Sequence, residues 1–161
     1  MPGEYFDRNA LSWAAGCAVV RAAGIVEDYA RMSIRIVRLG SPRAAGEGPR
    51  LGTVRRPPRG VKRTEYAKRD FFDVWLPELA PSAALFSWAR GQPWTPDRWR
   101  QFAKRYRKEM GEPAARHLLE TLAALSRQSS FSMGCYCEEE AHCHRSLLRE
   151  LLKEAGASII P

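Results

Sequence analysis

Residues 131–145 read FSMGCYCEEEAHCHR, and the change of pattern along this stretch decides the fold. Its beginning is typical of a β-strand, whereas the residues that follow it repeat leucine at helical spacing, at Leu147, Leu148, Leu151 and Leu152. Gly156 then marks the end of the helix, since glycine is the preferred residue just past a helix C-terminus. A strand that passes into a helix opens a crevice at its carboxyl end, where backbone N–H groups and the helix dipole favour anions and thiolates. We therefore expect an α/β fold with its functional site in this crevice.

The same stretch holds three of the four cysteines and two of the three histidines. Because side chains alternate along a strand, Cys135 and Cys137 are expected on one face of a strand that includes both. Cys143 and His144 are expected in the first turn of the following helix. Any chemistry is therefore expected here, and three interpretations of the cluster remain open.

The first interpretation is a metal site, in which a tetrahedral zinc ion is held by Cys135, Cys137, Cys143 and His144. The Cys-x-Cys spacing is tighter than in most structural zinc sites. The second is a thiolate nucleophile, Cys137 or Cys143, with a pKa lowered by the helix N-terminus and by His144 or Arg145. The third is purely structural, because free cysteines are among the most buried residues and fill small volumes in cores.

The net charge of +8 is concentrated in residues 43–69, which contain nine basic residues against two acidic ones. Within them, residues 55–62 read RRPPRGVK, a stiff segment rich in guanidinium groups that suits the phosphates of a nucleotide or of a nucleic acid. The predicted phosphate-binding residues are Arg55, Arg56, Arg59, Lys62 and, beside the helix N-terminus, Arg145. We expect the segment to lie beside the carboxyl end of the 131–137 strand. A solvated loop is the alternative.

Other elements are marked by their periodicity and their end signals. Strands are expected at residues 33–39 and 51–55, a short helix after Pro81-Ser82 that runs to Gly91, and a longer one from Thr95-Pro96-Asp97 to about Met110. A further helix starts at Pro113 and has an inward-facing stripe of Ala115, Leu118, Leu119, Leu122 and Leu125. The helix at residues 95–110 carries basic residues on one face and aromatic ones on the other, and the aromatic face is predicted to be core.

Length and cysteine placement restrict the class of protein. A chain of 161 residues is long enough for one core and short for two domains. Its four cysteines are unevenly placed and do not resemble a disulfide framework, so a reducing, cytoplasmic setting is expected. Because no apolar run is long enough to cross a bilayer, no membrane partner is expected.

Residues 1–31 differ from the rest, since they contain four acidic and three basic residues, a net charge of −1. Met32-Ser33-Ile34 reads like a natural protein start that runs directly into the first strand. We therefore interpret residues 1–31 as an extension, either helical or the product of a misassigned start, and residues 32–161 as the domain. Deleting the extension is expected to leave the melting temperature nearly unchanged.

The sequence resembles the YeaO-like family, domain of unknown function 488, over roughly residues 33–157. The resemblance rests on FDVWLPELAPS at residues 72–82, on Trp88, on residues 99–110 and on Cys143-His144-Arg145. It implies a compact bacterial α/β protein of unassigned activity, some of whose relatives carry a methyltransferase-type name. The commoner branch has RLWPRG where residues 55–60 read RRPPRG, and it lacks the three clustered cysteines, sharing only His144 and often His142. A chemistry common to the family would therefore not rest on zinc held by cysteines.

These observations predict a single α/β domain with a small, mostly parallel sheet covered by helices. The leading hypothesis for its function is an enzyme that acts on a phosphorylated substrate, a nucleotide or nucleic acid, with His144 and Cys137 or Cys143 at the reactive end. The alternative is a non-catalytic nucleic-acid-binding module whose Cys/His cluster is structural and holds zinc. The sequence leaves the choice between enzyme and binding module open, and it does not determine the oligomeric state.

Overall fold

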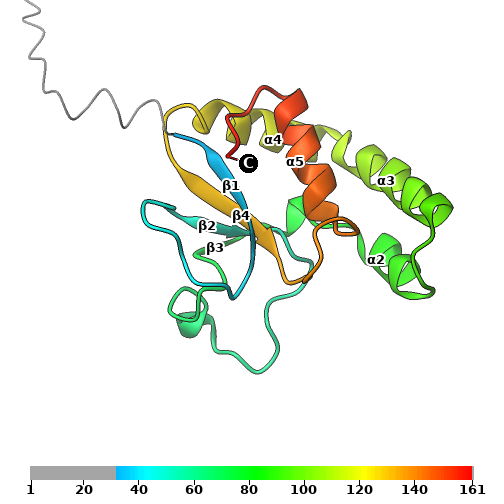
Figure 1. Cartoon of the computed structure of the whole chain (residues 1–161), viewed down its shortest axis with the longest axis horizontal. Helices are drawn as coiled ribbons and strands as arrows, with labels where there is room; N and C mark the ends of the chain where they lie inside the picture. Colours follow the sequence, from blue (N-terminus) through cyan, green and yellow to red (C-terminus); the bar gives the residue numbers. More distant parts are fainter. Residues whose placement is uncertain (1–31, 161) are drawn as a thin grey trace, which may run out of the picture.

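A computed structural model describes residues 32–160, and Figure 1 shows their arrangement. The sheet contains β1 (Ile34–Arg38), β2 (Arg50–Gly52), β3 (Val74–Trp75) and β4 (Phe131–Cys135). Its strand order is β1-β4-β2-β3, and every pairing is parallel. The predicted single α/β domain with a mostly parallel sheet is therefore confirmed, and all of its strand carboxyl ends lie along one edge.

The helices begin where the sequence signals placed them. They are α2 (Ala83–Arg90), α3 (Pro96–Met110), α4 (Pro113–Leu125) and α5 (His144–Glu154), with short 3-10 turns η1 (Arg63–Glu65) and η2 (Pro77–Leu79). The side chains of Ser82 and Thr95 accept hydrogen bonds from the backbone N–H groups of Leu85 and Arg98, respectively, and so cap α2 and α3. None of the helices within residues 32–160 has both the length and the apolar character needed to span a membrane.

The main core lies between the sheet and the helices. Phe131 and Met133 of β4 face helix side chains such as Phe102, Tyr106 and Leu148, all of them buried. The aromatic face of α3 is therefore core, as predicted. A second, smaller cluster contains Leu39, Val54, Phe72, Cys135 and Cys143. The two clustered cysteines thus belong to a core of their own at the carboxyl edge of the sheet.

Two sequence expectations fail within these elements. The second strand ends at Gly52, whereas residues 51–55 were expected to be extended. In α4, Leu125 is 49% exposed instead of facing inward, because the position one turn after Leu122 is Ser126, which is fully buried. Residues 1–31, on which the extension hypothesis depends, lie outside the described residues.

Candidate functional site

The functional stretch begins where β4 ends. Cys135 is the last residue of this strand, and its carbonyl accepts a hydrogen bond from the N–H of Leu39 at 2.9 Å. Cys137 lies beyond the strand, so the prediction that it lies on the strand is wrong. The physical reason is that the neighbouring β1 ends at Arg38, opposite Cys135, and offers no further ladder partner. Cys143 is the N-cap of α5, and His144 is its first helical residue, as predicted.

The turn between β4 and α5 brings three thiols together. The Sγ atoms of Cys135, Cys137 and Cys143 all lie within 4.8 Å of one another. The Sγ atoms of Cys135 and Cys137 are 3.6 Å apart. Cys135 and Cys143 are only 7% and 2% exposed, whereas Cys137 is exposed, and all three are free thiols. The cluster therefore has a buried side and a side that solvent can reach.

His144 is buried beside this cluster and held in one tautomer. Its Nε2 lies 2.8 Å from the backbone carbonyl oxygen of Thr53, which can only accept, so Nε2 carries the proton and donates. The lone pair of Nδ1 is then free, and Nδ1 lies 3.8 Å from the Sγ of Cys143. Burial lowers the pKa of His144 to about 4, which keeps the imidazole neutral.

The three thiols differ in pKa, so they do not ionise equally. The S–H of Cys135 donates to the sulfur of Cys137, and this bond, with a second from Cys143, lowers the pKa of Cys137 to about 2. The same bond raises the pKa of Cys135 to about 11, and the bonds to Cys135 and Cys137 raise the pKa of Cys143. The positive charge of Arg145 also favours the thiolate at Cys137. A single thiolate in this cluster therefore resides on the exposed sulfur.

Arg145 is buried beneath the turn between β4 and α5 and binds backbone carbonyls of that turn. Its side chain is buried, and its Nη2 donates to the backbone carbonyl of Glu138 at 3.0 Å. Its Nη1 lies 3.4 Å from the carbonyl oxygens of Val37 and Cys135. The guanidinium thus ties the turn to the ends of β1 and β4, while its charge remains close to the sulfurs.

The basic segment of residues 55–62 follows β2, and its start adjoins the cysteines. Thr53, just before it, donates its N–H to the carbonyl of Gly134 and accepts the His144 hydrogen bond. Arg55 is occupied by the carbonyls of Pro81 and Ala80, at 2.9 and 2.8 Å. The exposed side chains are those of Arg56, Arg59 and Lys62, and none of them has a hydrogen-bond or ion-pair partner within residues 32–160.

One basic residue at this edge was not predicted to belong to the site. Arg38 ends β1, is the register partner of Cys135, and forms a 3.0 Å ion pair with Glu138. The alternating pattern of residues 33–39 placed Arg38 on a strand, but only the strand order puts it next to the cysteines. His142 lies outside the sulfur cluster, where its ring packs against those of Trp94 and Trp99.

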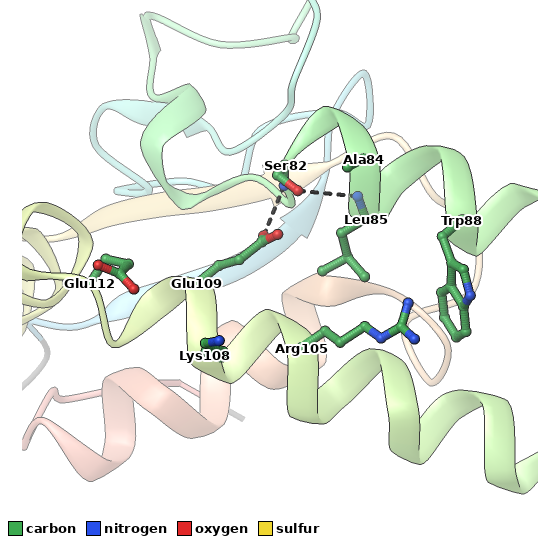
Figure 2. A pocket seen from close by; sticks show the side chains of 8 residues that line it. All are labelled: Ser82, Ala84, Leu85, Trp88, Arg105, Lys108, Glu109 and Glu112. Carbon is green, nitrogen blue, oxygen red and sulfur yellow. Dashed lines mark hydrogen bonds between the residues drawn. The ribbon is translucent and has the colours of Figure 1, made fainter.

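A separate hollow of about 560 Å³ lies between α2 and α3, as Figure 2 shows. Leu85 and Trp88 line it from α2, and Arg105 and Glu109 line it from α3. Glu109 also accepts a hydrogen bond from the N–H of Ser82, which fixes the start of α2 (Figure 2). The hollow shares no residue with the cysteine cluster, so its shape gives no information about the chemistry there.

The fold and the site together define the class of this protein: an α/β protein with a parallel sheet and a cluster of thiols and an imidazole at the carboxyl edge of that sheet. Within that class, the family model described as the active DUF488-N3 subclade matches residues 34–156. The chain therefore belongs to the DUF488 family, as its resemblance implied.

Three mycobacterial proteins, each described only as uncharacterised, are similar to this chain. Two are from strains of Mycobacterium tuberculosis and one is from Mycobacterium bovis. Each is 27% identical to it over 119 residues, which cover 74% of this chain and 92% of the relative. No solved structure matches the chain significantly.

Proposed function

We propose that the protein is an enzyme that acts on a phosphorylated substrate, a nucleotide or a nucleic acid, at the carboxyl edge of its sheet. The observation that carries this proposal is the exposed Cys137, whose sulfur lies against two buried thiols, one of which, Cys143, is in contact with a neutral histidine. Thiol donors and the charge of Arg145 favour the thiolate form, which is the nucleophilic form of cysteine. The description of the matching family model as an active subclade agrees with an enzyme.

In this proposal each member of the cluster has a separate role. Cys137 is the nucleophile, since it is the one thiol of the three that a substrate can reach. Cys143 donates to the Cys137 sulfur from the buried side, and its own sulfur lies next to the Nδ1 of His144. His144, anchored by the Thr53 carbonyl, places the lone pair of its Nδ1 beside the Cys143 sulfur.

The phosphate groups of the substrate would be held by Arg56, Arg59 and Lys62. These side chains are exposed on a segment that starts beside the His144 anchor, and none has an acidic partner within residues 32–160, so an anionic ligand would meet three uncompensated charges. Arg55 and Arg145 contribute charge, but their guanidinium groups are occupied by backbone carbonyls. The three free thiols fit a reducing cytoplasmic setting, which we include in the proposal.

Titration with nucleotides and short single-stranded oligonucleotides at several salt concentrations tests phosphate binding. We expect affinity to fall about tenfold or more in the double variant Arg56→Ala and Arg59→Ala, with a shallower salt dependence because about two phosphate contacts are lost. The matched control removes two arginines from exposed ion pairs elsewhere, Arg100→Ala and Arg116→Ala. Equal losses in both double variants would show that only net charge matters and would leave the assigned phosphate site without support.

The second candidate function is a non-catalytic nucleic-acid-binding module with a structural, zinc-bound cluster. The specific observation that favours it is the burial of Cys135 and Cys143 with their sulfurs turned toward a third. Chemical analysis of bound nucleotide or oligonucleotide after incubation separates the two. Product released by wild-type protein but not by Cys137→Ser, with binding unchanged, supports the enzyme. Unaltered ligand recovered from wild-type protein supports the module.

A further inference from the structure

The spacing of the three sulfurs is that of a metal coordination shell. Tetrahedral zinc with Zn–S bonds of about 2.3 Å separates its sulfur ligands by about 3.8 Å. The observed separation is 3.6 Å for Cys135 and Cys137, and all three sulfurs lie within 4.8 Å of one another. The ligands come from a strand end, a turn and a helix N-cap, so the backbone itself has brought them together.

His144 offers a fourth ligand atom of the right kind. In a tetrahedral zinc site an imidazole nitrogen lies about 3.6 Å from a sulfur ligand, and Nδ1 of His144 is 3.8 Å from the Sγ of Cys143. The hydrogen bond from Nε2 to the Thr53 carbonyl fixes the tautomer that leaves Nδ1 free. Such a bond from the second ring nitrogen to a carbonyl is the usual partner of a metal-bound histidine. Nδ1 of His144 contacts the sulfur of Cys143 but is not within 4.8 Å of all three sulfurs, so all four ligands can bind one ion only if the ring moves toward Cys135 and Cys137.

The charge of the surroundings also suits a metal thiolate. Three thiolates and a neutral imidazole around a divalent ion leave one negative charge. Buried Arg145 lies beside the cluster and offsets part of that charge, since its Nε also lies 3.9 Å from a carboxylate oxygen of Glu140. Zinc is the ion that this donor set prefers, since soft thiolates with imidazole in tetrahedral geometry select it over harder cations such as Mg²⁺ or Ca²⁺.

We propose that Cys135, Cys137, Cys143 and the Nδ1 of His144 bind one zinc ion, with Cys137 as the ligand exposed to substrate. The inference rests on the proposed enzymatic function in one respect: zinc binding would release the S–H protons of Cys135 and Cys143, and zinc, in place of those two donors, would hold Cys137 as a thiolate within reach of a substrate. Three ligands would then be buried or covered, and the fourth would be the reactive one.

Metal analysis of the full-length protein by mass spectrometry, after purification under reducing conditions, tests the site without any substrate. We expect about one zinc ion per chain, and a clear loss of zinc in Cys135→Ser and Cys143→Ser. The matched control is Cys17→Ser, which changes the fourth cysteine, outside the described residues. Zinc absent from folded wild-type protein, and not taken up when zinc is added back, would overturn the proposal.

A cobalt experiment tests the fourth ligand with a variant that can keep the hydrogen bond to Thr53. Co²⁺ taken up by wild-type protein should give the visible absorption of a tetrahedral thiolate site. In His144→Gln the side-chain amide can still donate to the Thr53 carbonyl, but it lacks the ligand nitrogen, so the spectrum should change and affinity should fall about tenfold or more. His142→Gln is the control. An unchanged spectrum in His144→Gln would remove His144 from the site. Product release from an added nucleotide in the same samples reports separately on the proposed enzyme, and nucleotide binding reports on the phosphate site of Arg56 and Arg59.

Discussion

Glu47 and Arg50 form an ion pair that is almost fully removed from solvent, with side chains 2% and 0% exposed. The carboxylate of Glu47 also accepts from the hydroxyl of Ser132 at 2.6 Å and from the N–H of Ala44 at 2.9 Å. The guanidinium of Arg50 donates to the carbonyls of Ser41 and Asp70 as well. This pair therefore joins two loops to β4 on the face of the sheet opposite the helices, where Ser132 lies between Phe131 and Met133 of the core face.

Glu47→Gln should destabilise the protein by about 3–5 kcal/mol, since it leaves the buried Arg50 without its anion. Burial alone would raise the pKa of Glu47, but hydrogen bonds from Arg50 and Ser132 outweigh it and lower the pKa to about 2. Because the folded-state pKa lies below the unfolded one, this stabilisation is complete above about pH 4.5 and is lost between about pH 4.5 and 2. Urea unfolding across this pH range measures it.

The control for this prediction is Glu120→Gln, which removes an exposed carboxylate paired with Arg116 at 3.7 Å. We expect a change of at most about 0.5 kcal/mol there. If both substitutions changed the free energy of unfolding by the same small amount, the Glu47–Arg50 pair would not be what holds the two loops against β4.

The same residue pair shows where sequence reasoning about charge fails. Arg50 counts toward the basic excess of residues 43–69, yet it is fully buried, and Arg55 is occupied by carbonyls of residues 25 and 26 positions later. The sequence shows that these residues are positively charged. It does not show that backbone carbonyls from distant parts of the chain accept hydrogen bonds from their guanidinium groups, because only the fold brings those carbonyls near. The cysteine cluster was recognisable because its members lie within nine residues in the chain, from 135 to 143.

At the scale of elements, β4 is the strand that positions the site, and Gly134 lets it lie close to β1. A Cβ atom at Gly134 would lie 2.6 Å from the carbonyl oxygen of Val37 and 2.8 Å from the side chain of Leu39. Such distances require β1 and β4 to separate, and Cys135 and Arg38 are the next register pair.

Gly134→Ala should therefore cost about 1–3 kcal/mol or more in unfolding free energy and lower metal or ligand affinity at the cysteines. Gly91→Ala is the matched control, since Gly91 ends α2 with negative φ and its nearest neighbour to a new Cβ would be the Trp88 carbonyl at an ordinary 3.5 Å. Chemical denaturation compares the two. A Gly134 variant as stable as the Gly91 variant would contradict close strand packing as the reason for glycine.

Helices could be predicted from sequence more completely than strands. Caps and prolines act within one turn, so Ser82, Thr95 and Pro113 identified their helices directly. A strand ends where its partner ends, and the partner of Cys135 is Arg38, far away in the chain. That is why Cys137 was wrongly placed on β4.

For the whole molecule, we predict that deletion of residues 1–31 leaves the described domain stable. Charge and composition change at Met32, and Ile34 is already held from both sides, by β4 and by backbone hydrogen bonds with Ser158 and Ile160. Differential scanning fluorimetry of the 32–161 fragment should give a melting temperature within about 3 °C of the full-length value, which corresponds to less than about 1 kcal/mol. A fall of about 10 °C would show that the first 31 residues are an integral part of the fold.

The strand order also fixes when the sheet can form during synthesis. β1 and β2 leave the ribosome early, but they do not pair with each other, because β4 lies between them and begins only at Phe131. Most of the chain must therefore be made before either early strand finds its main partner, and until then both carry unpaired edges. Folding of this small protein should accordingly be slow for its size and governed by distant contacts. The segment from β4 to α5 then completes both the sheet and the cysteine cluster.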